Sequence, residues 1–505
     1  MKMNLCTEEE KRIFNFLQQQ NCCLRCCFRF IGCRTIDCFQ DPIKFAKSAG
    51  YIEVEHVPFN NEVPCTACLG ILQNKIQEQV VEKIHVEVEK QSYDSETFIC
   101  ALTIPICISL REHFLHMQCA TQFNLSEDML LCLKVKLQNV KDVWKWITIP
   151  KIENAIKKQV DLTTPSPFII EIILKYEYNE KECEALLNTY KKTNNIEYKQ
   201  KRKCNDNRFS KTSIEILMTK ITDEEFFKCF KTVIFETTDK IYVEKIMCTH
   251  SSIFIGGRYN KLSRELSQTP WFINGEKKMQ TSVQDILCNP IAEVVKAQSI
   301  KFLSSGREDV DVRNIYSGRP FAVELINPQK SKITEKLLSD LVDEINRSSR
   351  QVQITSNLKV LSRIDLKKLK EGENVKTKFY RAFCICRDAT KDMISLEELN
   401  NLKRVKITQK TPVRVLHRRP LSPRERLIYE IRARWAKPQE LKKFNITNKD
   451  ASAFFVLDIK TQAGTYVKEF VHGDFGRTKP SLCDILNAEV DIVALDVTGI
   501  NLNWP

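Results

Sequence analysis

Two cysteine pairs near the start of the chain constrain its fold more than any other feature. Cys23 and Cys26 form one C-x-x-C pair, and Cys65 and Cys68 form a second. Two such pairs supply four thiolates, which hold a structural Zn²⁺ in a closed tetrahedral site. The sequence therefore predicts a structural zinc site that joins the two pairs. The segment between them is longer than in compact zinc patterns, and nearby cysteines remain rival ligands: Cys22, Cys27, Cys33 and Cys38.

The other cysteines and the apolar runs bear on where the protein acts. The chain has 21 cysteines among 505 residues, with no secretory pattern at its start. No apolar run approaches the roughly eighteen residues of a membrane span. We therefore expect reduced thiols rather than a disulfide framework. The expected compartments are nucleus and cytoplasm, with no membrane partner, and the expected state is a monomer.

Hydrophobic patterning predicts an α+β protein. A capping box at residues 7–10 predicts a first helix. Further runs alternate between strand-like and helix-like periods, with strands expected at 85–89, 101–105 and 168–174, and helices at 140–149 and 182–190. Residues 194–211 are polar and basic, which is typical of a flexible loop or insert. We expect three regions: a zinc-binding region over 1–70, a second region over 71–250 and a third over 251–505.

The pattern of the third region predicts a sheet covered by helices. A helix is expected over 282–297, a strand over 321–326 and an amphipathic helix over 333–345. In a further strand Tyr380, Ala382 and Cys384 share one face. Residues 254–271 combine glycines, cations and aromatics, and we interpret them as a loop. This loop offers groups that bind phosphate or stack on a base, although ordinary turn chemistry is the alternative: Arg258, Tyr259, Lys261, Arg264 and Trp271.

An acidic loop at residues 304–313 is the candidate active site. Glu308, Asp309 and Asp311 lie between Arg307 and Arg313. A carboxylate flanked by cations can stay ionised beside a phosphate backbone. We interpret the segment as the active-site loop of an RNA-modifying enzyme. The alternative is a tight turn with solvated charges.

The densest positive charge lies between residues 401 and 443. This stretch holds fourteen Lys or Arg against three Glu, an excess of eleven in a chain of net charge +14. Prolines bracket its centre at residues 410–420, so we expect a structured basic loop. Such a surface supplies affinity for phosphate, whereas a solvated charged face is the alternative. The candidate RNA contacts here are Arg414, His417, Arg418 and Arg419.

A strand over 455–461 turns at Gly464 into a helix that carries Lys468. We expect Gly473 or Gly476 to end this helix. A lysine just inside a helix start could point toward a carboxylate on a neighbouring strand. The alternative is a surface lysine.

Three of these segments resemble pseudouridine synthases. Residues 306–313 resemble the catalytic aspartate loop of that superfamily, with the Gly-Arg-x-Asp opening of the TruA branch. Residues 464–468 look like the motif of the TruB branch in which a basic residue pairs with the catalytic aspartate. Residues 257–271, 411–420 and 460–480 are similar to the archaeal and eukaryotic tRNA pseudouridine synthase family Pus10.

This resemblance implies a zinc-binding and THUMP-containing N-terminal region ahead of a catalytic domain with a central mixed β-sheet flanked by helices. It implies conversion of uridine to pseudouridine in the T arm of tRNA, at positions 54 and 55. Asp309 matches the catalytic aspartate, with Asp311 as its rival because two residues along an extended loop share a face. Tyr380 matches the active-site tyrosine, Lys468 the basic partner, and Val467 the apolar residue before it. The implied partners are tRNA and other structured RNAs, with structural zinc and no organic cofactor.

Two other functions compete with this interpretation. A non-catalytic RNA-binding scaffold would bind tRNA without isomerising it, and the joint presence of Asp309, Tyr380 and Lys468 argues against it. Another THUMP-bearing enzyme, such as a methyltransferase or thiolation enzyme, would need a glycine-rich nucleotide loop. None of the thirteen glycines forms such a pattern, which excludes that class.

Overall fold

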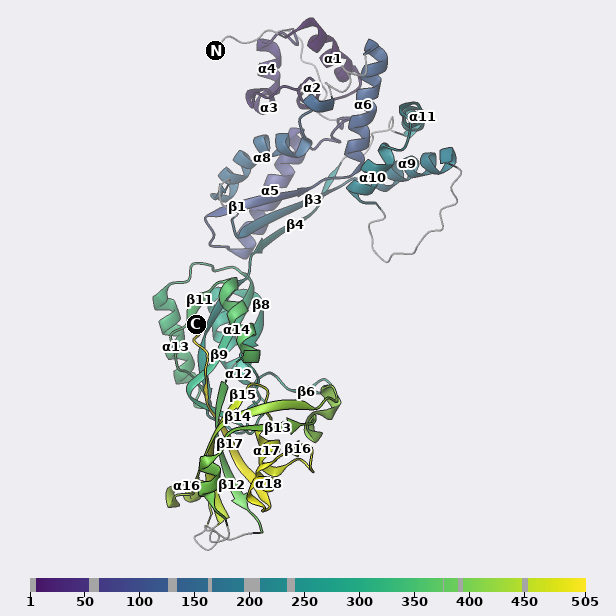
Figure 1. The fold of residues 1–505 in the computed structure, drawn as a ribbon. Coiled ribbons are helices and arrows are strands. Elements are labelled where there is room, and N and C mark those ends of the chain that lie inside the picture. Colours follow the sequence, from purple (N-terminus) through teal and green to yellow (C-terminus); the bar gives the residue numbers. More distant parts are fainter. Residues whose placement is uncertain are drawn as a thin grey trace. The chain divides into compact units, whose positions relative to one another are not determined.

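The computed structural model describes residues 6–53, 63–125, 134–161, 166–194, 209–233, 241–375, 377–388, 394–446 and 453–505. The chain forms two compact units, Met1–His250 and Ser251–Pro505 (Figure 1). Most of the segment predicted as a flexible loop, residues 195–208, lies outside the described residues. None of the helices within the described ranges is long and apolar enough to cross a membrane.

The first unit begins with a group of short helices. Thr7 caps the first helix, because its hydroxyl accepts a hydrogen bond from the Glu10 amide and the Glu10 carboxylate accepts one from the Thr7 amide. The predicted capping box is confirmed. The helices in this group are α1 (Glu8–Gln19), α2 (Leu24–Phe30), α3 (Asp37–Gln40) and α4 (Pro42–Ser48).

A small sheet and longer helices complete the first unit. The sheet has the order β2-β1-β3-β4, made of β1 (Thr97–Thr103), β2 (Gln159–Val160), β3 (Phe168–Lys175) and β4 (Tyr242–His250). The helices are α5 (Asn74–Gln91), α6 (Cys107–Phe123), α8 (Val140–Ile156), α9 (Asn179–Asn194), α10 (Lys211–Met218) and α11 (Asp223–Val233). One apolar cluster extends from Ile13 to Cys248, so the predicted regions 1–70 and 71–250 share a core.

The strand predicted at residues 85–89 is wrong, because this segment belongs to α5. The buried positions Ile76, Val80, Ile84 and Val88 recur every four residues along one side of that helix. Val86, which produced the alternating pattern, is 59% exposed. The polar positions between the valines therefore do not mark the faces of a strand.

An eleven-stranded sheet is the frame of the second unit, and its main path is β10-β5-β9-β17-β12-β15-β14-β13-β16. Its strands are antiparallel except that β17 runs parallel to β9, with Asp496 opposite Arg313. The predicted mixed sheet is confirmed. The strands are β5 (Ile253–Lys261), β8 (Ala297–Ser304), β9 (Arg313–Pro328), β10 (Val352–Ile354), β11 (Lys359–Leu361), β12 (Thr377–Cys386), β13 (Lys403–Gln409), β14 (Arg424–Trp435), β15 (Phe454–Gln462), β16 (Thr478–Lys479) and β17 (Val490–Ile500).

Helices cover the sheet of the second unit. The apolar cluster beneath α12 and α13 includes Leu287, Leu341 and Val323, and the cluster beneath α17 includes Phe470 and Leu457. These helices agree with the predicted helical flanks. The helices are α12 (Val283–Val295), α13 (Glu335–Ser348), α14 (Arg363–Val375), α15 (Leu396–Asn401), α16 (Pro438–Lys442), α17 (Val467–His472) and α18 (Leu482–Leu486), with a 3₁₀ helix η2 (Val413–Arg418) and a hairpin of β6 (Phe272–Ile273) and β7 (Glu276–Lys277).

Residues 254–261 form strand β5, so their interpretation as a loop is wrong. This strand lies between β9 and β10. At Gly256 an added Cβ would lie 2.6 Å from the carbonyl oxygen of Phe321. The glycine therefore permits close packing inside a sheet rather than a turn.

Candidate active site and metal centre

The acidic loop connects β8 to β9. Gly306 has a φ of +90° there, a conformation that favours glycine. The acidic residues that follow Gly306 differ in exposure. Glu308 is buried in the protein, whereas the Asp309 side chain is 36% exposed.

Buried Glu308 anchors the loop to the protein interior. Its carboxylate lies 2.7 Å from Arg319 Nε, and it accepts a hydrogen bond of 2.8 Å from the Tyr259 hydroxyl. Burial, followed by the Glu308 charge, raises the pKa of Tyr259 well above its ordinary value, which keeps its hydroxyl a hydrogen-bond donor. A buried ion pair with a further donor is rigid, so this arrangement fixes the base of the loop.

Lys261 holds the same loop from a second side. Its ammonium group donates hydrogen bonds to the carbonyl oxygens of Leu266 (2.8 Å), Asp309 (3.0 Å) and Val310 (2.7 Å). Its side chain is completely buried. Lys261 therefore fixes the backbone that presents Asp309.

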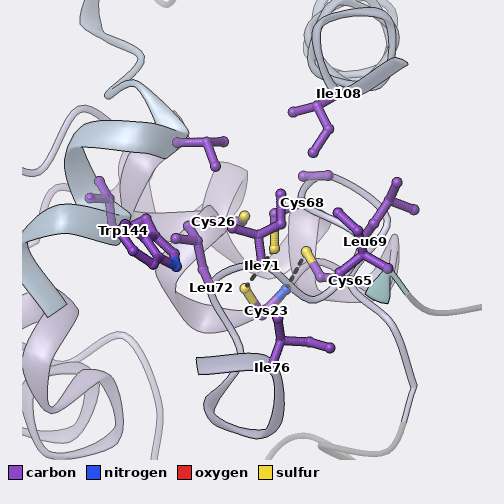
Figure 2. Close-up of a cluster of buried hydrophobic side chains, with 14 of the residues drawn as sticks. Cys23, Cys26, Cys65, Cys68, Leu69, Ile71, Leu72, Ile76, Ile108 and Trp144 are labelled. Carbon is purple, nitrogen blue, oxygen red and sulfur yellow. Dashed lines mark hydrogen bonds between the residues drawn. The ribbon is translucent and has the colours of Figure 1, made fainter. Parts of the chain in front are cut away.

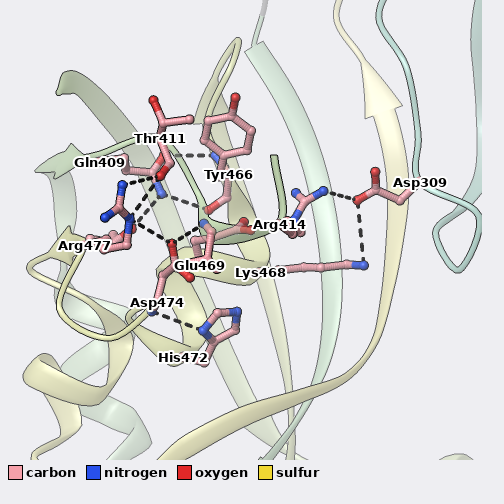
Figure 3. A network of polar contacts seen from close by, with 12 residues as sticks. Asp309, Gln409, Thr411, Arg414, Tyr466, Lys468, Glu469, His472, Asp474 and Arg477 are labelled. Carbon is pink, nitrogen blue, oxygen red and sulfur yellow. Dashed lines mark hydrogen bonds and ion pairs between the residues drawn. The ribbon is translucent and has the colours of Figure 1, made fainter. Parts of the chain in front are cut away.

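Two cations from other elements approach the exposed carboxylate of Asp309. Arg414 of η2 donates a hydrogen bond of 2.8 Å to Asp309 Oδ2, and Lys468 Nζ of α17 lies 3.8 Å from the same oxygen. Figure 3 shows both side chains extending toward Asp309. Asp309 therefore forms a hydrogen-bonded ion pair with Arg414 and lies close to a second cation.

Lys468 bonds more closely to Asp311 than to Asp309. Its ammonium group lies 2.6 and 2.8 Å from the two oxygens of Asp311. Burial alone would raise the pKa of Asp311, but the hydrogen bonds and charge of Lys468 outweigh it and lower that pKa. Lys468 thus lies close to both Asp309 and Asp311, the two residues that the sequence left as rival candidates for the catalytic aspartate.

Glu469 is a member of this network that the sequence analysis missed. Its buried carboxylate accepts a hydrogen bond of 2.6 Å from Arg414 Nε. Arg414 therefore spans a buried carboxylate and an exposed one. The position of Glu469 directly after Lys468 was the only sequence signal for it.

Tyr380 lies on β12, on the face that the sequence predicts. It packs at the edge of the apolar cluster that contains Ala382 and Cys384. Burial raises the pKa of Tyr380 to about 12, with the charge of Asp309 adding to the increase and that of Arg319 opposing it. The phenol is therefore neutral at physiological pH, and its pKa depends in part on the charge of Asp309.

Several residues expected to contact RNA instead pack or form bonds within the protein. Tyr259 and Lys261 are buried and bond to groups of the acidic loop, so the structure does not present them to an RNA surface. Val467, the apolar residue before Lys468, is buried and belongs to the apolar core. Arg258 bonds to carbonyl oxygens of Leu502, Trp504, Ser317 and Gly318, and Arg313 forms an ion pair with Asp496. Both guanidinium groups are thus already engaged within the protein.

The other predicted RNA contacts remain at the surface. Arg307, His417 and Arg419 are exposed. Arg414 is also accessible, although its guanidinium already bonds to two carboxylates. The side chain of Arg418 lies outside the described residues. The basic loop is structured, as the sequence predicts, because η2 runs through its centre.

The four cysteines of the predicted zinc site meet in the first unit. The sulfur atoms of Cys23, Cys26, Cys65 and Cys68 all lie within 4.8 Å of one another and are buried. Figure 2 shows them converging among apolar side chains. Cys23 Sγ and Cys68 Sγ are 3.9 Å apart, close to the roughly 3.8 Å edge of a tetrahedron with Zn–S bonds of about 2.3 Å. The donor set therefore fits a structural Zn²⁺.

Groups around these sulfurs fit thiolate ligands. The Cys23 amide donates a hydrogen bond of 3.2 Å to Cys65 Sγ, and Arg29 donates one of 3.5 Å to Cys26 Sγ. Such outer contacts orient metal ligands and balance their charge. Among the described residues, the rival cysteines are not members of this four-sulfur group.

Comparison with known families decides the relationship of the chain. The family model described as "Pus10, C-terminal" matches residues 254–501, and the model "Eukaryotic Pus10, N-terminal" matches residues 65–248. The chain is also 34% identical, over 465 residues, to the human protein named tRNA pseudouridine synthase Pus10; the match covers 90% of this chain and 82% of the human protein. The chain belongs to the Pus10 family.

Other Pus10 relatives agree with this assignment. A Drosophila melanogaster protein named putative tRNA pseudouridine synthase Pus10 is 33% identical, over 87% of this chain and 84% of its own. The Methanocaldococcus jannaschii Pus10 protein is 36% identical over 52% of this chain and 56% of its own. A chain of a Cbf5–Nop10–Gar1 complex matches 48% of each chain at 13% identity, with a TM-score of 0.26. The assignment to the Pus10 family rests on the sequence matches alone.

Proposed function

We propose that this protein is a tRNA pseudouridine synthase that isomerises uridine in the T arm of tRNA, at positions 54 and 55. Its relatives carry the name tRNA pseudouridine synthase Pus10. The arm and positions come from the motifs shared with that family. The observation that carries the chemistry is the partly exposed Asp309 carboxylate, held by Arg414 at 2.8 Å and flanked by Lys468 at 3.8 Å.

Asp309 is the reacting carboxylate in this proposal. The isomerisation breaks the bond between C1′ and N1 of uracil and forms one between C1′ and C5. The proton on C5 is lost and N1 gains one, so no oxidant or reductant is consumed. A carboxylate starts this reaction by attack on the sugar or the base, or by assisting departure of the base. Each route requires an ionised carboxylate that the substrate can reach.

In this proposal, Arg414 and Lys468 offset the negative charge of Asp309 when RNA covers the site. RNA excludes water and brings phosphates, and both effects disfavour a carboxylate anion. Two cations within 4 Å of Asp309 oppose them. Asp311 has a positioning role here, because it holds the Lys468 ammonium group through two short hydrogen bonds.

Tyr380 acts through its ring in this proposal. A phenol with a pKa of about 12 is not an effective base at neutral pH. Its aromatic ring, within electrostatic range of Asp309, provides a stacking surface for a uracil rotated out of the tRNA. Base flipping costs on the order of a few kcal/mol, which stacking and phosphate contacts to the basic loop offset.

The first unit serves RNA binding rather than chemistry. Cys23, Cys26, Cys65 and Cys68 would hold a Zn²⁺ ion, which supplies cross-linking of the fold and no reactive position. A THUMP-containing region within residues 71–250 would contribute further tRNA contacts. Both assignments follow from the family motifs and the cysteine geometry.

Pseudouridine mapping tests the proposed function. Unmodified tRNA transcript is incubated with wild-type protein or with Asp309→Asn, and carbodiimide-stop sequencing then locates pseudouridine. We expect T-arm signals with the wild type and none with the variant. If the wild type binds the transcript tightly and leaves every uridine unchanged, the protein is an RNA-binding scaffold and the proposal is wrong.

A further inference from the structure

Phe475, in the turn after α17, is the most exposed large apolar side chain in the described part of the chain. It is 95% exposed. Isolated apolar residues at a surface need no special explanation. Phe475 differs because its backbone conformation is unfavourable and its neighbours hold it there.

Four successive residues of this turn have a positive φ. The values are +77° at Gly473, +47° at Asp474, +55° at Phe475 and +76° at Gly476. Glycine adopts this region freely and aspartate tolerates it, but a bulky aromatic residue rarely does. Neither packing nor backbone preference therefore explains an aromatic ring at this position.

Neighbouring residues fix the turn in this conformation. Asp474 is buried, and its carboxylate accepts a hydrogen bond of 3.2 Å from the Val413 amide. Arg477 donates hydrogen bonds of 3.0 and 2.7 Å to the Thr411 carbonyl oxygen. Strained residues that persist because their surroundings hold them often occur at functional sites.

The turn is attached to the groups that surround Asp309. Val413, which bonds to Asp474, directly precedes Arg414, and Arg414 bonds to Asp309. Figure 3 shows Asp474 and Arg477 in the same network as Arg414 and Lys468. The exposed ring thus projects from a turn clamped to the basic loop. A rigid aromatic side chain within a basic surface is the arrangement by which proteins stack on unpaired bases.

We propose that Phe475 is a stacking residue for an unpaired base of the RNA substrate, outside the site that holds the reacting uridine. This inference rests on the proposed function, because it takes tRNA as the ligand. The charge around the turn favours a polyanion over an apolar protein surface. Stacking would orient the RNA as the target nucleotide enters the site next to Asp309.

Two substitutions separate stacking from a structural role. Phe475→Asn removes the ring and places a residue that tolerates a positive φ, so the thermal midpoint should stay the same or rise. Phe475→Tyr keeps the ring. Ile364→Asn is the control, because it removes another exposed apolar side chain, 68% exposed on α14.

The experiment measures the tRNA dissociation constant at fixed salt, the T-arm pseudouridine yield and the thermal midpoint of the full chain. We expect Phe475→Asn to weaken binding about tenfold, in the range of one lost base stack. Phe475→Tyr and Ile364→Asn should stay within about twofold of the wild type. Pseudouridine formation by the wild type checks the proposed function separately.

Two outcomes overturn the inference. The first is Phe475→Asn binding and modifying tRNA like the wild type while the wild type is active. The second is an equal loss for Phe475→Asn and Phe475→Tyr with a lower thermal midpoint, which would make the residue structural.

Discussion

Arg414 donates a hydrogen bond of 2.8 Å to Asp309, although 105 residues separate them in the chain. Its Nε atom bonds at 2.6 Å to buried Glu469. The guanidinium is therefore positioned by the buried carboxylate of Glu469 and bonds with its other edge to Asp309, the proposed reacting carboxylate. This relationship places Arg414 in the proposed catalytic arrangement as well as in the basic surface.

Replacing Arg414 by methionine should slow the reaction by about 100-fold, the order expected for loss of one preorganised charged donor. It should also lower the free energy of unfolding by about 1–2 kcal/mol, because Glu469 loses its partner while Arg414 is partly solvated. Single-turnover kinetics and urea titration measure the two effects. Arg419→Met, an exposed neighbour, is the control and should alter mainly tRNA affinity. Equal rates for both variants would contradict the role of Arg414.

Asp311 should contribute acid-dependent stability through Lys468. The pKa of Asp311 is below its ordinary value in the folded protein. Its stabilising effect is therefore present above the unfolded pKa of about 4, and it is lost as pH falls through the lower folded value. The thermal midpoint of Asp311→Asn should lie below that of the wild type at pH 6, and the difference should shrink as the pH falls below about 4. A constant difference across this range would contradict the ion pair.

Tyr380→Phe should retain at least about a tenth of wild-type activity, because the ring remains and the phenol is neutral with a pKa of about 12. Tyr380→Leu should lose most of it. The rate of the wild type should also show no ionisation of Tyr380 below about pH 10. These rates are measured as single turnovers between pH 6 and 10. A large loss in Tyr380→Phe would instead assign proton transfer to the hydroxyl.

Removal of zinc should destabilise the first unit. Metal analysis should find about one zinc per chain, and a chelator added in mild denaturant should lower the thermal midpoint, because thiolate coordination contributes directly to folding. Cys65→Ser should lose the metal. Cys33→Ser is the matched control and should keep it, since Cys33 lies outside the four-sulfur group. Metal retained in Cys65→Ser and lost in Cys33→Ser would assign the site to a rival ligand set.

Local periodicity predicted much of the fold. The amphipathic pattern of α13 and the shared face of Tyr380, Ala382 and Cys384 were visible because burial follows the helical and strand periods. Local periodicity failed where a strand is buried on both of its faces. Tyr259 and Lys261 looked like surface groups beside glycines, but β5 is paired on both sides in its sheet, and the Lys261 ammonium group bonds to three carbonyl oxygens of neighbouring loops.

The members of the site were easier to predict than their pairing. Asp309, Lys468 and Arg414 were each singled out by residue type and neighbourhood. Their contacts depend on how β8, η2 and α17 meet in space, which no local pattern encodes. For this reason the sequence did not show that Lys468 bonds more closely to Asp311, or that Arg414 joins Asp309 to Glu469.

The most direct test of the central claim compares two aspartates in one assay. Single-turnover formation of T-arm pseudouridine is measured with the wild type, Asp309→Asn and Asp311→Asn, each at saturating protein. We predict that Asp309→Asn shows no product above background and still binds tRNA, whereas Asp311→Asn stays within about tenfold of the wild type. Activity retained by Asp309→Asn and abolished in Asp311→Asn would contradict the account and assign the chemistry to Asp311.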